Sequence, residues 1–324
     1  MRVVVFAYHN MGIVGIRALL DHGFTVPMVL SHEDDPKENR WFGSVAEFCR
    51  DRGIPVFFPK DVNAAPWPDR IRDAKPDLLF SFYYRSMLKK EILEIPPLGA
   101  MNLHGSLLPK YRGRAPVNWA LVKGETETGV TLHYMTEKPD AGDIVGQAAV
   151  PIAPDDTALT LFGKMEGAAS RLLDDLLPRI GKGEIPRRPN DLARGSYFGG
   201  RRPEDGRIDW SRPAVEIYNL VRAVTRPYPG AFTGLEGEKL TVWWATPLRG
   251  EEGSSLSPGT IRVSGGPTYA MAGGCVAPVS GPRRVVVETG EGWLQLEEIE
   301  WKSRTAKGEA IVSLLAGAAN GRLS

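Results

Sequence analysis

The stretch from Met101 to Pro116 reads MNLHGSLLPKYRGRAP, and it joins an apolar strand to polar side chains and a basic turn. Asn102 and His104 interrupt the strand at a spacing of two. Because residues two apart in a strand point to the same side, we expect the amide and the imidazole to face one cavity. The stretch therefore predicts a strand that ends at a functional site.

Strands and helices alternate in the sequence around this stretch. Short apolar runs such as VVVFAY (Val3–Tyr8) and DLLFSFYY (Asp77–Tyr84) are typical of buried parallel strands. GIVGIRALLDHG has helical periodicity and ends at a glycine, while TVPMVL is a strand whose proline indicates an edge or a bulge. This alternation predicts an open parallel, Rossmann-like α/β sheet, in which ligands bind at the carboxyl ends of the strands.

After Gly124 the sequence pattern changes. TGVTLHYMT and DIVGQAAVPI are expected to form a hairpin through EKPDAG, followed by a helix from Thr157 to about Ile180. A proline- and arginine-rich segment and several short strands then predict a smaller, β-rich and barrel-like domain. We expect a catalytic domain at 1–190, a linker at 191–204, a β-rich domain at 205–310 and a tail at 311–324.

Composition limits the partners that the chain is expected to have. Forty basic and 39 acidic side chains give a formal charge of +1, which provides no broad surface for nucleic acid or anionic lipid. No apolar run approaches a membrane span, so we expect a cytoplasmic protein without nucleic-acid or membrane partners. Cys49 and Cys275 fit no metal or redox spacing and are expected to be free thiols. No metal-binding motif is present, so we expect metal-free chemistry.

The chemistry that Asn102 and His104 suggest is acyl transfer to an amine. An attacked carbonyl develops an oxyanion that an amide can stabilise, and an imidazole can take the proton of the amine. Asp140, in the turn EKPDAGD, would orient His104 and raise its pKa. Taken alone, each residue also has an ordinary structural interpretation, as a backbone cap, a core histidine and a turn former.

A longer pattern carries a family resemblance. NLHGSLLPKYRGRAPVNWAL, followed by GETETGVTLHYM and then DAGDIV, resembles the signature of the 10-formyltetrahydrofolate-dependent formyltransferases. The resemblance implies that Asn102 stabilises the oxyanion, that His104 is the acid/base and that Asp140 tunes it. It also implies a set of folate contacts, with the pterin in an apolar cleft near Leu88 and Phe82. These contacts are Ser86, Met87, Leu88, Arg114, Thr136, Glu137, Lys138, Pro139 and Asp140.

Further segments are similar to one branch of this family. VVFAYHNMG, SFYYR and RAVTRPYPGAF resemble the formyltransferase half of the bacterial polymyxin-resistance enzyme, which formylates UDP-4-amino-4-deoxy-L-arabinose in lipid A modification. No second nucleotide-binding fingerprint follows, so we expect a stand-alone form. For the nucleotide sugar, His9 lies at the end of the first strand, and the predicted domain junction offers Arg201, Arg202 and Arg222.

Other interpretations stay open at this point. Methionyl-tRNA formylation predicts tRNA binding with a steep salt dependence. The second rival is formylation of another nucleotide-linked amino sugar, with dTDP or GDP as the nucleotide. A folate- or nucleotide-sensing module without turnover is the non-enzymatic alternative, although a pure binder needs no base. The sequence leaves open whether the chain forms a homo-oligomer.

Overall fold

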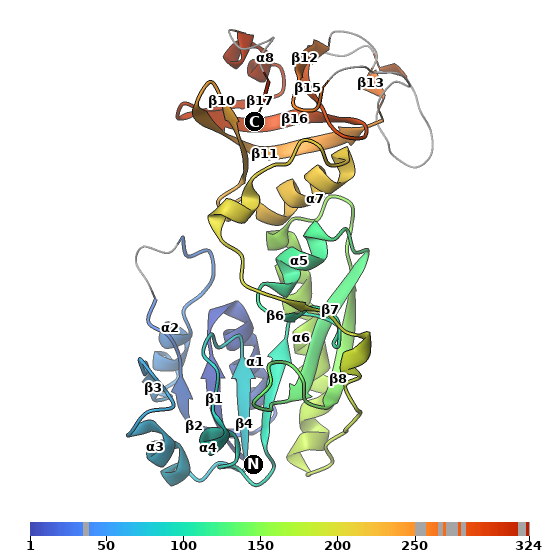
Figure 1. The fold of residues 1–324 in the computed structure, drawn as a ribbon. Helices are drawn as coiled ribbons and strands as arrows, with labels where there is room; N and C mark the ends of the chain where they lie inside the picture. Colours follow the sequence, from blue (N-terminus) through green and yellow to red (C-terminus); the bar gives the residue numbers. More distant parts are fainter. Residues whose placement is uncertain are drawn as a thin grey trace. The chain divides into compact units, whose positions relative to one another are not determined.

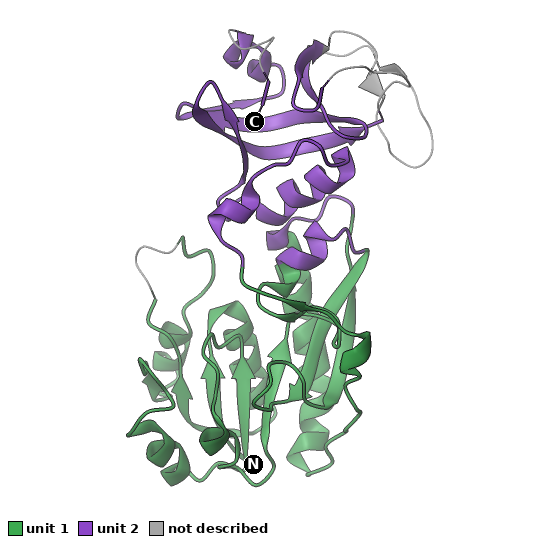
Figure 2. Cartoon of the chain, in the orientation of Figure 1, with its two compact units in different colours: residues 1–117, 126–153, 160–200 green, residues 118–125, 154–159, 201–324 purple. Residues whose placement is uncertain are grey.

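The structure is a computed structural model, which describes residues 1–34, 39–249, 257–264, 268–269, 278–279, 283–316 and 322–323. The chain divides into two compact units (Figure 2). Unit 1 comprises residues 1–117, 126–153 and 160–200, and unit 2 comprises residues 118–125, 154–159 and 201–324. Two short segments from the first half of the chain therefore belong to unit 2.

Unit 1 contains a seven-stranded sheet with the strand order β3-β2-β1-β4-β5-β7-β8 (Figure 1). The first five strands of this order are parallel, whereas β7 and β8 are antiparallel to their neighbours. The predicted parallel sheet and the predicted hairpin are thus both present. The bounds are β1 Arg2–Ala7, β2 Thr25–Leu30, β3 Val56–Phe57, β4 Leu78–Phe82, β5 Ala100–His104, β7 Glu127–Tyr134 and β8 Ile144–Pro151.

Helices connect these strands, as the alternation in the sequence predicts. The helix α1 packs closely on β4, because a Cβ atom at Gly15 would overlap the ring of Phe82. The long helix α6 buries an apolar stripe that includes Leu161, Met165 and Leu173. The bounds are α1 His9–Asp21, α2 Val45–Arg50, α3 Trp67–Asp73, α4 Lys90–Leu93, α5 Pro116–Val122 and α6 Ala158–Gly181.

The proline in β2 lies in a bulge, as predicted. Arg2 of β1 pairs with Thr25, and Val4 pairs with Met28, so β2 has one residue more than β1 between these two pairs. Pro27, which has no amide hydrogen to donate, is one of the residues in this irregular step.

The basic turn and the predicted linker meet in unit 1. The short strand β6 (Arg112–Gly113) pairs in parallel with β9 (Tyr197–Phe198), which lies within the segment 191–204. The amide of Arg114 donates to the carbonyl oxygen of Phe198 at 3.0 Å. This part of the predicted linker is therefore hydrogen-bonded to the stretch that follows β5.

Unit 2 is built on a six-stranded antiparallel sheet with the order β10-β11-β16-β15-β12, in which β17 also pairs with β16. The segment predicted as a tail, 311–324, includes most of α8, and Ile311 within it is buried. The bounds are β10 Ala231–Leu235, β11 Glu238–Leu248, β12 Ile261–Ser264, β15 Arg284–Glu288, β16 Trp293–Trp301, β17 Arg304–Lys307, α7 Ala214–Val224 and α8 Ala310–Leu314.

Two further expectations concern the membrane and the cysteines. Among the helices of the described residues, none combines the length and the hydropathy that a membrane span requires. Cys49 is a buried free thiol, and burial raises its pKa to about 11 despite the nearby Arg52. Cys275 lies outside the described residues.

Candidate active site

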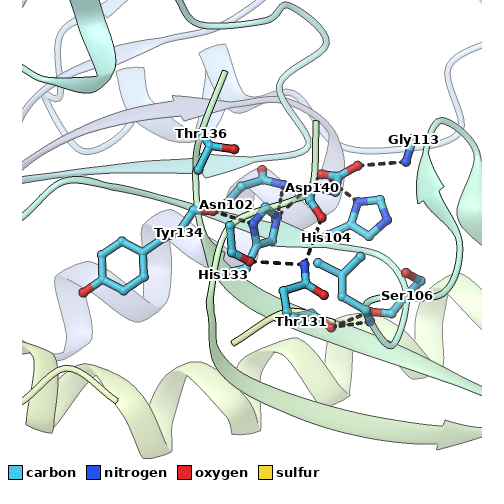
Figure 3. Close-up of polar contacts among 12 residues, drawn as sticks. Asn102, His104, Ser106, Gly113, Thr131, His133, Tyr134, Thr136 and Asp140 are labelled. Carbon is cyan, nitrogen blue, oxygen red and sulfur yellow. Dashed lines mark hydrogen bonds and ion pairs between the residues drawn. The ribbon is translucent and has the colours of Figure 1, made fainter. Parts of the chain in front are cut away.

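The pairing of β5 with β7 places polar side chains on one face of the sheet in unit 1. In this antiparallel pair, Asn102 lies opposite His133, and His104 lies opposite Thr131. Figure 3 shows the carboxamide and the two imidazoles turned toward the carboxylate of Asp140. The two residues that the sequence singled out in β5 therefore have neighbours from β7 and from the turn after it.

Asp140 reaches this face from the turn between β7 and β8. Its carboxylate Oδ1 lies 3.5 Å from Nδ1 of His104 and 3.5 Å from Nε2 of His133. Its other oxygen, Oδ2, accepts a hydrogen bond from the amide of Gly113 at 2.8 Å. One carboxylate oxygen therefore faces two imidazoles, while the second oxygen is fixed by the basic turn.

The turn that carries Asp140 is held from outside the hairpin. Asp140 has a φ of +49°, a left-handed conformation that is unfavourable for a residue with a side chain. The Nδ2 group of Asn190 donates to the carbonyl oxygen of Asp140 at 3.1 Å and to that of Gly142 at 3.2 Å. Asn190, which the sequence did not indicate, thus holds the turn at Asp140 itself and two residues further on.

Two backbone carbonyl groups determine where the protons of the histidines lie. Nε2 of His104 is 2.8 Å from the carbonyl oxygen of Tyr111, and Nδ1 of His133 is 2.8 Å from that of Tyr134. Since a carbonyl oxygen only accepts, each of these nitrogens carries a hydrogen. In the neutral rings, the proton acceptors are therefore Nδ1 of His104 and Nε2 of His133.

The electrostatics of the site favour a neutral base beside an ionised acid. Burial lowers the pKa of His104, and this effect outweighs the opposing effects of Asp140 and of the Tyr111 carbonyl. Asp140 thus acts on His104 in the predicted direction, but the net pKa lies below the ordinary value. Burial raises the pKa of Asp140, but His104, His133 and the Gly113 amide together bring it below its usual range.

The SLLP turn after β5 holds the Tyr111 carbonyl in place. Ser106 Oγ donates to the carbonyl oxygen of Lys110 at 2.7 Å, and Thr131 Oγ1 donates to that of Ser106 at 2.6 Å. The amide of Leu108 in turn donates to Thr131 Oγ1 at 3.1 Å. These bonds join the turn to β7, so the acceptor for His104 is tied to the sheet.

Glycines allow the close approach of chain segments around the site. A Cβ atom at Gly105 would overlap the hydroxyl of Tyr83, which places Tyr83 directly beside the residue after His104. At Gly113, which has a φ of +99°, a Cβ atom would overlap the carbonyl oxygen of Phe198. Position 113 therefore requires glycine on steric grounds, because the overlap is with the main chain, whereas a larger residue at Gly105 would displace the Tyr83 side chain.

The predicted folate contacts at 86–88 lie in a fixed loop after β4. Asn63 accepts from the amide of Lys89 at 2.8 Å and donates to the carbonyl oxygen of Met87 at 3.0 Å. Ser86 is exposed, the side chain of Met87 is 51% exposed, and Leu88 is buried in the core. Phe82 is completely buried against α1, so its own side chain does not line an open cleft.

The other predicted folate contacts lie on the turn after β7 and on the basic turn. Thr136, Glu137 and Lys138 are exposed, Pro139 is half-buried, and Arg114 is exposed. A cavity of about 620 Å³ borders the turn, with Leu93, Ala100, Met135, Thr136 and Glu137 among its lining residues. Ser86, Met87, Leu88 and Arg114 are not part of this lining.

His9, a predicted substrate contact, lies in an aromatic cluster of unit 1. Its ring is surrounded by Trp41, Phe42, Tyr83 and Phe162, with ring centroids 4.2 to 6.0 Å away. Neither ring nitrogen has a hydrogen-bond partner among the described residues. Burial, aided by a nearby arginine, lowers the pKa of His9 to about 4. His9 is therefore a neutral polar group inside an aromatic environment.

The three arginines predicted to bind substrate belong to unit 2. Arg222 is buried, and its Nε donates to Asn219 Oδ1 at 2.9 Å. The guanidinium of Arg201 lies 4.6 Å from the ring centroid of Trp119 and donates to the carbonyl oxygen of Asp205. Arg202 is exposed. The contacts of Arg222 give it a structural role in unit 2.

His133 is a residue of the site to which the sequence assigned no role. Asn102 Nδ2 lies 3.2 Å from its Nε2, and its side chain is buried. The alternation in TGVTLHYMT indicates a strand but not which face His133 occupies. In the part of the chain that the structure describes, no group of three His, Cys, Asp or Glu side chains is arranged to hold a metal ion.

Two family models match the chain. Residues 1–177 match the model described as formyl transferase, and residues 201–313 match the one described as formyl transferase, C-terminal domain. The first match covers more than half of the chain.

Solved structures of similar fold extend over both units. An N-formyltransferase from Helicobacter canadensis, in complex with folinic acid and dTDP-3-aminofucose, is 18% identical with a TM-score of 0.65, over 91% of this chain and 97% of that one. A sugar N-formyltransferase from Shewanella sp. FDAARGOS_354 is 18% identical with a TM-score of 0.60, and the match covers 75% of this chain and 96% of that one. HypX from Aquifex aeolicus, in complex with tetrahydrofolic acid, is 18% identical with a TM-score of 0.57, over 98% and 48%.

Proposed function

We propose, because the chain belongs to the formyl transferase family, that it moves the formyl group of 10-formyltetrahydrofolate to the amino group of a nucleotide-linked sugar. The observation that carries this proposal is the cluster of Asn102, His104 and Asp140. It combines an amide donor, a neutral base and an ionised carboxylate on one face of the sheet. In amine formylation, such groups can stabilise the oxyanion, accept the amine proton and hold the base in place.

The geometry supports a direct transfer. The amine nitrogen attacks the formyl carbon, a nitrogen–carbon bond forms, and the carbonyl oxygen becomes an oxyanion that Asn102 Nδ2 stabilises. The attacking nitrogen loses a proton to Nδ1 of His104, since Nε2 is already bonded to the Tyr111 carbonyl. The imidazolium then pairs with Asp140. When the bond from the formyl carbon to N10 of the folate breaks, His104 returns the proton to N10.

The proposed acceptor is UDP-4-amino-4-deoxy-L-arabinose, as in the lipid A modification that confers polymyxin resistance. This choice is supported by the segments SFYYR and RAVTRPYPGAF, which resemble that branch of the family. A nucleotide-linked amino sugar as the acceptor class is also supported by two of the similar structures, an N-formyltransferase in complex with dTDP-3-aminofucose and a sugar N-formyltransferase. His9 is a proposed sugar contact, because its ring nitrogens have no partner among the described residues and Tyr83 joins its cluster to Gly105.

The proposed folate contacts are the exposed Met87 and the turn from Thr136 to Asp140. Asn63 fixes the loop of Met87, so an apolar ring would meet a preformed surface rather than a loop that must first order. Arg114, which is exposed, is the proposed partner for an anionic group of the folate.

Incubation of the protein with 10-formyltetrahydrofolate and a panel of nucleotide-linked amino sugars tests the proposal. We expect release of tetrahydrofolate and a formylated UDP-4-amino-4-deoxy-L-arabinose, identified by mass spectrometry. His104→Ala should lower kcat by about 10²–10⁴, the usual contribution of a general base. His22→Ala, a change at a histidine outside the site, serves as the matched control and should leave the rate unchanged.

The outcomes separate the competing functions. If only a dTDP-linked sugar is formylated, and no UDP-linked sugar is, the proposed reaction is supported but the proposed acceptor is wrong. Formylation of methionyl-tRNA alone would replace the proposal by the tRNA function. Tight binding of folate without product from any acceptor would support the binding module instead.

A further inference from the structure

We infer that His133 is a positioning residue, which fixes the carboxamide of Asn102 in the one orientation that can stabilise an oxyanion. The inference rests on the proposed function, because it concerns the transition state of formyl transfer. His133 does not need to touch either substrate for this role. It acts through Asn102, its cross-strand neighbour on β5.

The first step of the argument is the tautomer of His133. Its Nδ1 lies 2.8 Å from the carbonyl oxygen of Tyr134 and therefore carries the hydrogen. The residue is 1% exposed, and the neutral form of its ring has a lone pair at Nε2. This nitrogen can accept one hydrogen bond but cannot donate one.

The second step is the choice that this lone pair imposes on Asn102. The two ends of a carboxamide have opposite hydrogen-bonding character, since Nδ2 donates and Oδ1 accepts. At 3.2 Å from Nε2 of His133, the group that forms a bond is Nδ2 of Asn102. If the amide turned over, Oδ1 would face the lone pair of His133, and two acceptors would repel each other.

The third step connects this orientation to the reaction. The Nδ2 group has two hydrogens, and the bond to His133 uses one of them. Figure 3 shows Asn102 close to His104 and Asp140. We infer that the second hydrogen is the one available to a developing oxyanion. An inverted amide would present Oδ1 to the oxyanion and would raise the barrier instead of lowering it.

The position of Asp140 shows what protonation of His133 would change at the site. Asp140 Oδ1 is 3.5 Å from Nε2 of His133 and equally 3.5 Å from Nδ1 of His104. A protonated His133 would donate to this oxygen and would weaken the pairing of Asp140 with His104 during the reaction. It would also lose the lone pair that orients Asn102.

Two isosteric variants test the inference in the full chain. His133→Gln can keep an acceptor oxygen near the position of Nε2, whereas His133→Asn keeps a donor near Nδ1 and lacks the acceptor. For UDP-4-amino-4-deoxy-L-arabinose formylation, we expect the Asn variant to lower kcat by roughly 10- to 100-fold, which is at most the lower end of the effect of losing an oxyanion donor outright. We expect little change in KM and most of the rate to be retained in the Gln variant. Equal losses in both variants would overturn the inference.

A double-mutant cycle separates positioning from a general structural effect. If His133 acts through Asn102, His133→Asn should cause no further loss of kcat in the Asn102→Ala background. Multiplicative losses would assign the effect to something other than Asn102 and would overturn the inference. Far-ultraviolet circular dichroism and thermal unfolding of each variant identify any change that merely prevents folding.

Nitrogen NMR of the wild-type protein gives a readout that needs neither a variant nor turnover. With ¹⁵N-labelled histidine, His133 is expected to carry its hydrogen at Nδ1 and His104 at Nε2. A His133 signal typical of the Nε2–H form, or of a protonated ring at neutral pH, would contradict the inference. If the wild-type protein forms no formylated sugar, the proposed function fails, while the NMR result still decides the orientation of Asn102.

Discussion

At the residue scale, the proposed mechanism depends on which ring nitrogen of His104 can accept a proton. Nε2 donates its hydrogen to the Tyr111 carbonyl oxygen, so Nδ1 is the nitrogen that can accept a proton. Nδ1 lies 3.5 Å from the carboxylate of Asp140. Burial keeps the imidazole neutral, while Asp140 moves its pKa in the opposite direction. The carboxylate therefore has a measurable effect on the pH at which the base becomes protonated.

Asp140→Asn should change the pH profile in a defined direction. The proposed mechanism requires a neutral His104, so kcat/KM should fall as the pH drops through the pKa of this group in the free enzyme. Removal of the carboxylate removes an effect that raises this pKa, and the acid limb should move to lower pH. We also expect kcat at neutral pH to fall by about 10² or more, as for other His-orienting carboxylates.

The control for this prediction is Asp174→Asn. Asp174 pairs with His22 at 3.0 Å in an exposed position, and its removal should leave the profile unchanged. An acid limb that stays in place in Asp140→Asn would mean that a group other than His104 determines it.

A second prediction at the residue scale concerns His9 and the pH dependence of the free energy of unfolding. Its pKa is lowered from 6.5 to about 4 by burial and Arg85, so only the unfolded state takes up a proton between these values. The contribution of His9 to stability is complete above pH 6.5 and is lost as the pH falls toward 4. Over that window the loss is about 3 kcal/mol.

His9→Phe should remove this part of the pH dependence. The free energy of unfolding of the wild-type protein and of the variant is measured in urea at pH 8 and at pH 4.5. The other histidines contribute equally in both proteins, so their effect cancels in the comparison. We expect the wild-type protein to lose more stability than the variant on acidification. An equal loss in the two proteins would show that His9 is not the source.

At the element scale, the pairing of β5 with β7 explains what the sequence could and could not predict. The spacing of Asn102 and His104 in one strand was sufficient to place both side chains on one face. The face of His133 depends on the antiparallel register and on an irregularity of β7 between Leu132 and His133. Neither feature can be predicted from the local sequence pattern, so the sequence did not identify His133 as a residue of this face.

The helix α7 gives an element-scale correction. Arg222 was expected to contact substrate because it is a cation near the predicted junction. Instead it is buried on α7, bonded to Asn219 one turn earlier and facing the carbonyl oxygen of Asp156 at 3.4 Å. The flanking Val221 and Ala223 are also buried, so the apolar context of the arginine was the signal against an exposed position.

Arg222→Met should therefore destabilise the protein. The change leaves the polar groups of Asn219 and Asp156 buried without their cationic partner, and we expect a loss of about 3 kcal/mol in the free energy of unfolding. Arg212→Met is the matched control, since Arg212 forms an exposed pair with Glu216. It should change stability by less than about 0.5 kcal/mol. Similar losses in both variants would contradict the assigned role.

At the scale of the whole molecule, the length of the chain and the change in its sequence pattern were sufficient to predict two domains. Which segments of the chain belong to each domain was not predictable. The segments 118–125 and 154–159 belong to unit 2, although they lie within the first half of the sequence. Asn118 in the first segment donates to the carbonyl oxygen of Ala223 at 2.7 Å, and Tyr218 donates to that of Pro154 at 2.8 Å. Such contacts across a long sequence separation leave no local pattern.

A fragment of residues 1–200 tests this division. It retains both segments but loses Tyr218 and Ala223, so the buried amide of Asn118 loses the carbonyl to which it donates. We expect limited proteolysis of the fragment to cut within 118–125 and 154–159, at positions that the intact chain protects. Protection of both segments in the fragment would mean that they are stable without the rest of unit 2.

The two carbonyl groups that fix the histidine tautomers have a consequence for how this enzyme can vary. Both acceptors belong to the main chain, at Tyr111 and Tyr134, and every amino acid supplies the same carbonyl oxygen. Replacement of either tyrosine side chain can reshape the surroundings of the site, yet it deletes neither acceptor. The path of the backbone therefore determines which ring nitrogens of His104 and His133 carry a hydrogen. Side chains at positions 111 and 134 can vary without changing this.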